Sequence, residues 1–235
     1  MSPVRAFQEN SNLLVKDRLA EVLRKEIVAG RLVPGESIVE GQWAAKLGVA
    51  QASVREALNI LANKGFVEKG SGRSARVIKL SRDEVRQLFE MRSVLEGVAA
   101  RYVAENQPDL RDVDQALADM VAAAETRNLT AYYERDLEFH LLIAQKTGNR
   151  FLVQQLRWLL SPLFAFFIMN LQIERDNPAF WKGSIEGHRE IIAVLRNGDP
   201  IAAEKHMIEA IQGFFAQTRQ YSSLADQRRT SSEVA

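Results

Sequence analysis

The stretch KLGVAQASVREALNILANKGFV, from Lys46 to Val67, constrains the fold of this chain more than any other part. A short helix is predicted to end at the Gly48-Val49 corner, and the next helix places Val54, Leu58 and Leu61 on one apolar face. Two helices joined by so tight a turn are typical of a helix-turn-helix, whose second helix enters the major groove of DNA. A helical hairpin used for protein contact is the alternative interpretation.

The residues around this stretch complete a small domain. Apolar periodicity predicts helices over 12–29, about 40–47 and about 51–63. Two strand-like segments, 66–69 and 75–80, flank the turn formers Gly70, Ser71 and Gly72. Three helices followed by a hairpin predict a winged helix-turn-helix DNA-binding domain over residues 10–80.

From Ser81 onward the pattern is helical throughout, so the fold class is mainly α. Ser81 with Glu84 three residues later forms a predicted capping box. Helices are expected at 81–105, 109–127, 129–147, 149–171, 176–197 and 199–221, with Gly, Asn and Pro at the breaks. We expect an all-α antiparallel bundle over 81–221 and a disordered tail at 222–235.

Composition excludes several classes of protein. The 235 residues suit two modest domains, and the chain has no cysteine, which excludes disulfides and thiolate metal sites. No apolar run is expected to reach the roughly 20 residues of a membrane span. The N-terminal MSPVRAFQEN lacks the apolar core of a signal peptide. A cytoplasmic protein without a membrane partner is therefore expected.

Charge is distributed unevenly along the chain. The first 80 residues hold 13 Lys and Arg against 8 Asp and Glu, whereas the remainder holds 18 against 22. A basic N-terminal part is suited to meeting a polyanion such as DNA, although small domains often differ by a few charges.

The predicted recognition helix has short side chains at its N-terminus. Ala52 and Ser53 allow close approach to the groove, and Gln51 can make paired hydrogen bonds to adenine. Arg55 points away from the apolar face and can contact a phosphate or a guanine. At the tip of the wing, Gly72 and Arg73 can reach the minor groove or the DNA backbone. These six residues are the candidate DNA-binding set.

One helix face in the second half carries a candidate metal site. Asp136 and His140 are four residues apart and share a face, and His188 lies on the apolar stripe of a later helix. A carboxylate and two imidazoles from facing helices suit a divalent metal. The alternative is that each histidine is a hydrogen-bonded core residue.

Arg92 also lies on an apolar stripe, where an unpaired guanidinium would be costly. It either forms a structural ion pair, with Asp136 or Glu96, or clamps a ligand carboxylate in bidentate fashion. Ser184, four residues before His188, can donate a hydrogen bond to the same ligand. Arg92 and Ser184 are thus candidate effector-binding residues for a small organic acid.

These motifs carry a family resemblance. Residues 27–77 resemble the DNA-binding domain of GntR-family transcriptional regulators, with the LGV corner, VREAL at 54–58 and the wing glycine in matching places. The segments MRSVLEGVAARY, DLEFHLLIAQKTGN and GHREIIAVLRNGDP resemble the FCD effector domain of the FadR subgroup. The resemblance covers residues 10–220. It implies a homodimer that binds double-stranded operator DNA, acts as a repressor and releases or grips the operator in response to an effector.

The resemblance also bears on the metal. FCD-type domains commonly bind a divalent ion such as Zn, Ni or Mn through an Asp, a His four residues later, a His on a distant helix and a fourth His. Asp136, His140 and His188 match the first three, but Ala210 stands at the fourth position and His206 lies one turn earlier. The site therefore has three ligands completed by water or effector, or has lost its metal.

Two further departures concern DNA and catalysis. The family usually has arginine at the place of Gln51 and a polar or charged residue at Gly41, so the operator preference is expected to differ. A metal-dependent enzyme acting on a small carboxylate is the alternative function, but no nucleophile or general-base motif accompanies the three metal-ligand candidates.

Overall fold

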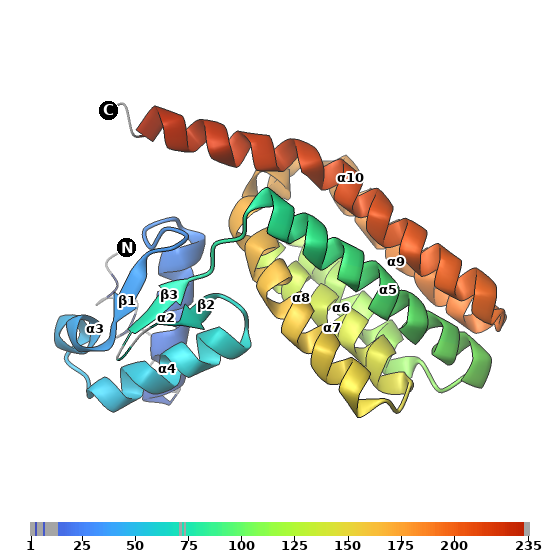
Figure 1. Ribbon diagram of the computed structural model, residues 1–235, viewed down its shortest axis with the longest axis horizontal. Coiled ribbons are helices and arrows are strands. Elements are labelled where there is room, and N and C mark those ends of the chain that lie inside the picture. Colours follow the sequence, from blue (N-terminus) through green and yellow to red (C-terminus); the bar gives the residue numbers. More distant parts are fainter. Residues whose placement is uncertain (1–2, 4–6, 8–13, 71, 73, 233–235) are drawn as a thin grey trace. The chain divides into compact units, whose positions relative to one another are not determined.

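The computed structural model describes residues 3, 7, 14–70, 72 and 74–232, with side chains at 172, 173 and 218–232 excepted. Its contacts divide the chain into two compact units. The first consists of residues 1–80 with 161–169, and the second of residues 81–160 with 170–235. Figure 1 shows a small mixed unit and a larger helical one, and the predicted mainly α fold class is confirmed.

Three helices of the first unit form the helix-turn-helix and its support. They are α2 (Val15–Val28), α3 (Glu40–Leu47) and α4 (Gln51–Asn63). Gly48 ends α3 with φ +66°, a left-handed conformation that glycine adopts without strain. The corner predicted from Gly48-Val49 therefore has the backbone that a helix-turn-helix needs.

A three-stranded antiparallel sheet forms the wing of the first unit. The strands are β1 (Ser37–Val39), β2 (Val67–Lys69) and β3 (Ser74–Val77), in the order β1-β3-β2. Ile38 pairs with Ala75 and Val67 pairs with Val77. The sequence predicted β2 and β3 but not β1, because a three-residue strand beside a turn is too short for a periodic signal.

Apolar side chains from the helices and from the sheet of the first unit form one core. Because α2 and α4 pack face to face and the sheet covers one side, these residues are almost fully buried: Leu19, Leu23, Ile38, Val54, Leu61, Phe66 and Val77. The apolar face predicted for the recognition helix therefore points inward and leaves the opposite face of α4 exposed.

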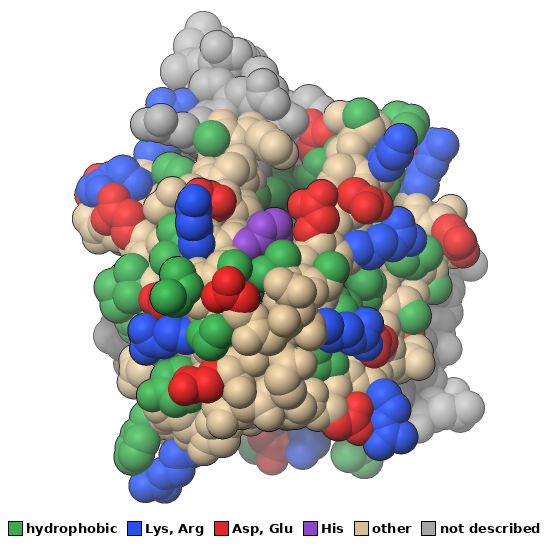
Figure 2. Space-filling model, turned by 90° about the vertical axis from the view of Figure 1, so that its right-hand side faces the viewer, with side chains coloured by type: hydrophobic (Ala, Val, Ile, Leu, Met, Phe, Trp, Pro, Cys, Tyr) green, Lys and Arg blue, Asp and Glu red, His purple; other side chains and the backbone are tan. Residues whose placement is uncertain are grey.

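The second unit is a bundle of helices. They are α5 (Arg82–Asn106), α6 (Arg111–Glu125), α7 (Leu129–Lys146), α8 (Arg150–Asn170), α9 (Pro178–Asn197) and α10 (Pro200–Ser232). Helix α8 contributes all but its residues 161–169, which belong to the first unit. Ser81 Oγ accepts from Glu84 N and the Glu84 side chain accepts from Ser81 N, so the predicted capping box is present. On the face shown in Figure 2, acidic, basic and hydrophobic side chains are interspersed, as is usual for a solvent-exposed surface.

Two features of this unit depart from the sequence prediction. A 3-10 helix, η1 (Gln172–Asp176), precedes α9, and α10 continues to Ser232 instead of ending near residue 221. Residues 222–232 were expected to be a disordered tail, but their backbone is helical, and the segment contains no Gly or Pro that would stop a helix. Residues 233–235 lie outside the described part.

The expectation about apolar runs needs correction as well. Helix α8 is long and apolar enough, by length and composition, to cross a membrane. However, 56% of its apolar window is buried inside the protein, as is typical of a core helix. Pro162 lies within α8, which the sequence had predicted as a continuous helix.

Candidate functional site

The N-terminus of α4 is open, as the short side chains predicted. Ala50 precedes the helix and gives it no side-chain cap. Ala52 is exposed, whereas Gln51 and Ser53 are half-buried. A Cβ added at Gly41 would lie 4.0 Å from Gln51 Nε2, so Gly41 is the immediate neighbour of the Gln51 amide. Ser53 N donates to the Ala50 carbonyl at 3.0 Å, which leaves the backbone N–H groups of Gln51 and Ala52 and the Gln51 amide for a base edge or a phosphate.

Arg55 is held in place by α3. Its Nε and Nη2 donate to Glu40 Oε1 and Oε2 at 3.0 and 2.8 Å. Glu40 is buried, whereas the Arg55 side chain is 52% exposed. The buried carboxylate therefore orients the guanidinium, whose other side is open to solvent. Hydrogen bonding to Glu40 raises the Arg55 pKa further above its usual value. A positive group at this fixed position can contact a phosphate or a base in the groove.

Some of the basic residues around the recognition helix form ion pairs within the protein. Gly72 is exposed with φ +70°, and Arg73 lies outside the described residues. Arg24 and Arg31 pair with Glu21 and Glu26, in both cases with a shortest contact of 2.7 Å. Part of the positive charge of the N-terminal unit is therefore neutralised within the protein.

Asp136, His140 and His188 meet inside the second unit. All three are buried, and one ligand atom from each lies within 4.8 Å of the others. Both His140 Nε2 and His188 Nε2 face the same carboxylate oxygen, Asp136 Oδ1, at 3.1 and 3.0 Å. The two helices that the sequence pattern set opposite each other, α7 and α9, thus place the three predicted ligands together.

The outer nitrogens of both imidazoles lie beside oxygen atoms. His188 Nδ1 donates to the backbone carbonyl of Ser184 at 2.7 Å, and His140 Nδ1 contacts Glu96 Oε2. A ring whose proton is on Nδ1 turns the lone pair of Nε2 toward a carboxylate oxygen, which is also an acceptor. Two lone pairs that converge on a carboxylate oxygen in this way require positive charge nearby, from protons on the rings, from the Arg92 guanidinium 2.8 Å from His140 Nε2, or from a metal ion.

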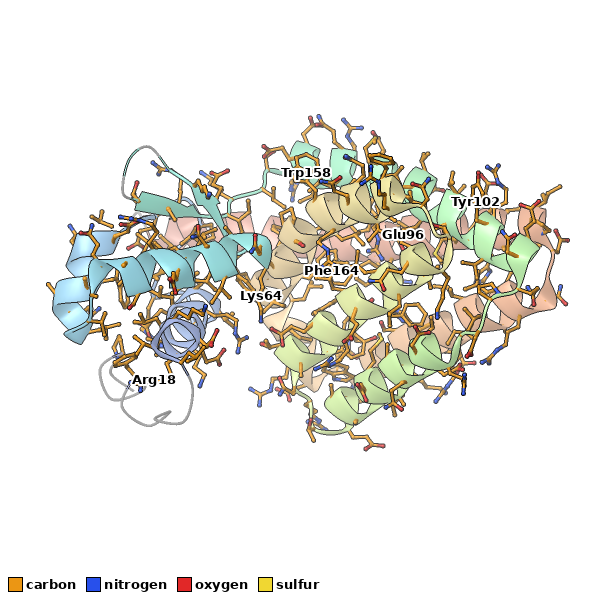
Figure 3. The ribbon with its side chains drawn as sticks, turned by 90° about the horizontal axis from the view of Figure 1, so that it is seen from below. Arg18, Lys64, Glu96, Tyr102, Trp158 and Phe164 are labelled. Carbon is orange, nitrogen blue, oxygen red and sulfur yellow. The ribbon has the colours of Figure 1, made fainter. Side chains whose placement is uncertain are left out.

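Arg92 and Glu96 border the three ligands. Arg92 Nε donates to Glu96 Oε1 at 2.6 Å, and Arg92 Nη2 lies 2.8 Å from His140 Nε2. Glu96, labelled in Figure 3, projects from α5 into the bundle, and both side chains are almost fully buried. The ion pair with Glu96 that the sequence offered as one alternative for Arg92 is therefore present. The effector-clamp role stays a prediction.

Opposing influences set the charges of the cluster. Burial alone would raise the pKa of Asp136, but His188 and His140 outweigh it and lower that pKa well below its usual value. Burial would likewise raise the pKa of Glu96, and Arg92 and His140 lower it. Burial lowers the pKa of His140, yet Glu96 and Asp136 raise it overall. Both carboxylates are therefore charged near neutral pH, and the cluster is a site for positive charge.

Aromatic side chains pack around the polar cluster. Phe139 contacts the His140 and His188 rings edge to face, with centroids 5.4 and 4.9 Å apart. The Tyr132 hydroxyl and Ser184 Oγ are 2.6 Å apart, and burial raises the Tyr132 pKa far above its usual value, so the phenol is neutral. Ser184 thus contacts His188 through its backbone carbonyl and Tyr132 through its hydroxyl, and its effector-binding role stays a prediction.

Glu96 is the site residue that sequence reasoning missed. It was considered only as an ion-pair partner, although its position one turn after Arg92 placed it on the same helix face. His206 is half-buried on α10 and lies outside the cluster found among the described side chains. Its Nε2 is buried and has no hydrogen-bond partner within the described part of the chain.

The fold and site define a class: a winged DNA-reading domain joined to a helical domain with a buried polar cluster. Comparisons with known proteins identify that class. Residues 15–77 match the family of bacterial regulatory proteins of the gntR type, and residues 87–213, more than half of the chain, match the FCD domain. The chain belongs to the GntR-family regulators that carry an FCD domain.

Relatives agree with this assignment. The "probable D-xylose utilization operon transcriptional repressor" of Paenarthrobacter nicotinovorans is 28% identical over 87% of this chain and 88% of its own length. The "Glc operon transcriptional activator" of Escherichia coli K12 is 29% identical over 62% of this chain and 66% of its own length. The solved structure of E. coli McbR/YncC has a TM-score of 0.67 at 21% identity, covering 88% of this chain and 98% of that one, and supports the fold alone.

The family settles the class of function. GntR regulators with FCD domains control transcription and bind small-molecule effectors in the FCD domain. The metal-dependent enzyme considered as an alternative is not supported, because the relatives are transcriptional regulators. This chain is therefore a transcriptional regulator and not an enzyme.

Proposed function

We propose that this regulator binds double-stranded operator DNA as a cytoplasmic homodimer, and that a small organic acid in the helical domain controls its operator affinity. Residues 10–80 would form the DNA-binding domain and residues 81–221 the effector and dimerisation domain. The matches at 15–77 and 87–213 support this division. Repression is the sign we favour, because a relative that matches 87% of the chain is described as a repressor.

The observation that carries the effector proposal is the buried cluster beside Arg92. Asp136, His140 and His188 offer one oxygen and two nitrogens to a divalent ion, and Arg92 lies next to them. A carboxylate ligand is attracted by both a metal ion and a guanidinium. Ser184 adds a hydroxyl near His188 and favours an acid that also carries a polar group.

The residues present fit a metal with three protein ligands. The converging acceptors suit a cation, and the contacts of the two Nδ1 atoms with the Ser184 carbonyl and with Glu96 resemble the second-shell partners that orient metal-binding imidazoles. Ala210 at the place of the fourth ligand leaves a position for water or effector. When bound, a Zn, Ni or Mn ion would supply a Lewis-acidic centre for the effector's oxygen atoms.

Elemental analysis of protein purified without chelator and without a histidine tag tests the metal. Wild-type protein should contain about one equivalent of metal, and His140→Ala should contain little. His206→Ala is the matched control, because His206 lies outside the cluster. Metal-free wild type, even after exposure to Zn²⁺, Ni²⁺ and Mn²⁺, would remove the metal from the proposal.

A thermal-shift screen of hydroxy, keto and sugar acids tests the effector. An acid that raises the melting temperature of the wild type should leave Arg92→Gln unshifted, because the variant lacks the guanidinium. The same acid should change the affinity for a DNA fragment from the regulated promoter. Equal shifts in both proteins would remove Arg92 from the effector site.

The homodimer is proposed from an exposed apolar surface. Helices α5 and α8, which lie side by side in Figures 1 and 3, both expose large hydrophobic side chains. On α8, Trp158 and Phe151 are 74% and 61% exposed, and on α5 the exposed set is Met91, Val94 and Tyr102. Exposed apolar side chains gathered on neighbouring helices mark an interaction surface. A two-fold pair also suits a palindromic operator.

A further inference from the structure

His140 Nε2 lies between two groups that make opposite demands on it. Arg92 Nη2 is 2.8 Å away, and an arginine nitrogen can only donate. Asp136 Oδ1 is 3.1 Å away, and a carboxylate oxygen can only accept. A bare Nε2 accepts from Arg92, whereas a protonated Nε2 donates to Asp136, so one nitrogen cannot satisfy both neighbours at once.

Glu96 decides which nitrogen of His140 is bare. Its Oε2 contacts His140 Nδ1, and its Oε1 accepts from Arg92 Nε at 2.6 Å. Because a carboxylate oxygen can only accept, the neutral ring carries its proton on the Nδ1 atom beside Glu96, and its lone pair is on Nε2, 2.8 Å from Arg92 Nη2. One carboxylate therefore orients both the imidazole and the guanidinium, and all three side chains are buried.

A single lone pair can bind a metal ion or accept from Arg92, but not both. We propose that Arg92 occupies the metal-binding position of His140 until a divalent cation displaces it. Glu96 keeps hold of Arg92 through Nε, so that the displaced Nη groups turn to the carboxylate of the effector. This inference rests on the proposed function, and within it Glu96 is a positioning residue.

The consequence is that metal and acid bind cooperatively. Metal occupancy releases the donor groups that clamp the acid, and an acid bound to Arg92 keeps it away from His140. By linkage, each ligand strengthens the binding of the other by the same factor. Metal availability would then gate the response to the effector.

Titration of chelator-treated, untagged protein with Zn²⁺ in a calorimeter, without acid, tests the competition. Arg92→Gln should bind Zn²⁺ about tenfold more tightly than wild type, which is the effect of one charge-assisted hydrogen bond. Arg86→Gln is the control, because Arg86 lies on the same helix and pairs with Asp83 and Glu90 on its surface. It removes the same charge and should bind Zn²⁺ like wild type.

A second variant separates the hydrogen bond from the charge. Arg92→Lys keeps the positive charge but replaces the fork of the guanidinium with one nitrogen, which cannot donate to Glu96 and His140 from two places. We expect Arg92→Lys to bind Zn²⁺ nearly as tightly as Arg92→Gln. If Arg92→Lys matches wild type, the effect is one of charge and the competition is wrong.

Nitrogen-15 NMR of the wild type provides a test that needs no variant to fold. The chain has three histidines, so His140 can be assigned with few controls. Addition of Zn²⁺ should move the His140 Nε2 signal to that of a metal-bound nitrogen and, in the same titration, change the Arg92 Nη signals. Arg92 Nη signals that stay constant while His140 binds Zn²⁺ would overturn the inference.

Glu96→Gln should weaken Zn²⁺ binding about tenfold and shift the His140 Nδ1 signal, because the amide nitrogen that replaces one oxygen donates and cannot accept from Arg92 or His140. The outcomes are distinguishable from failure of the proposed function. Wild type that binds no metal defeats the metal site itself. Wild type that binds metal at Asp136, His140 and His188 with no effect from Arg92 substitutions defeats only the competition.

Discussion

At the scale of single residues, Arg55 has two roles, and a single substitution to alanine would remove both at once. It partners the buried carboxylate of Glu40 and presents an exposed guanidinium on α4. Removing it deprives a buried carboxylate of the two hydrogen bonds from Arg55, which is costly to stability, and also removes a candidate phosphate or base contact. The two roles can be separated by changing the partner as well.

We predict that Arg55→Ala lowers the melting temperature of the protein by roughly 5 °C and abolishes operator binding at moderate salt. Glu40→Gln added to Arg55→Ala should restore most of the melting temperature, because the buried charge is gone. It should not restore DNA binding. Thermal denaturation and fluorescence anisotropy with labelled DNA measure the two effects, and recovery of DNA binding in the double variant would show that Arg55 acts only on the fold.

Gln51 lies at the helix tip beside Gly41, in place of the arginine usual for the family. We predict that Gln51→Arg shifts the preferred half-site base from adenine toward guanine by a factor of about 10. Competition between single-base variants of the operator in band shifts measures this ratio. A ratio that does not change would show that Gln51 does not contact a base.

At the scale of elements, the start of α5 depends on the capping box of Ser81 and Glu84. We predict that Ser81→Ala destabilises the protein by about 1 kcal/mol, because the Glu84 backbone N–H loses the hydroxyl that accepts from it. Ser81→Asp should retain most of the stability, since aspartate also accepts at an N-cap. Chemical denaturation of the three proteins compares them, and equal stability of Ser81→Ala and wild type would show that the cap contributes nothing.

The elements that sequence predicted well are those with local signals. The recognition helix spans the predicted residues because Ala50-Gln51 and Lys64-Gly65 mark its ends. Strand β1 was missed because its pairing with β3 is a tertiary contact that leaves no pattern in three residues. The predicted end of α10 was too early because the polar residues after 221 were interpreted as disordered, although no Gly or Pro interrupts the helix there.

The candidate site shows the same limit. Periodicity could set Asp136, His140 and His188 on inward faces, and Arg92 on an apolar stripe, because each pattern lies within one helix. It could not show that Glu96 also contacts His140, or that Glu40 fixes Arg55, since these two contacts join different helices across 44 and 15 residues of sequence. Such contacts depend on how the helices pack against one another in the fold, which periodicity within one helix does not show.

At the scale of the whole molecule, function depends on a paired DNA-binding unit. We predict that Trp158→Ser combined with Val94→Ser shifts the protein from dimer to monomer at micromolar concentration and weakens operator binding at least tenfold. Both side chains lie on the exposed α5 and α8 surface. Sedimentation velocity measures the association state.

Ile201→Ser is the control for this pair, because Ile201 is 79% exposed on α10 and lies off the α5 and α8 surface. It should leave the dimer intact. A double variant that remains dimeric would place the dimer contact elsewhere, and a wild type that is monomeric at the concentration where it binds DNA would remove the dimer altogether.

Helix α5 is continuous and links the polar cluster to the DNA-binding domain. It begins directly after the DNA-binding domain and carries Arg92 and Glu96 three to four turns along the same unbroken rod. From Ser81 to Arg92 the rod is about 16 Å long, so a tilt of about 10° around Arg92 would displace its first turn by about 3 Å. A small tilt of α5 around a bound molecule would thus move the start of the helix by a distance comparable to the spacing between adjacent base pairs.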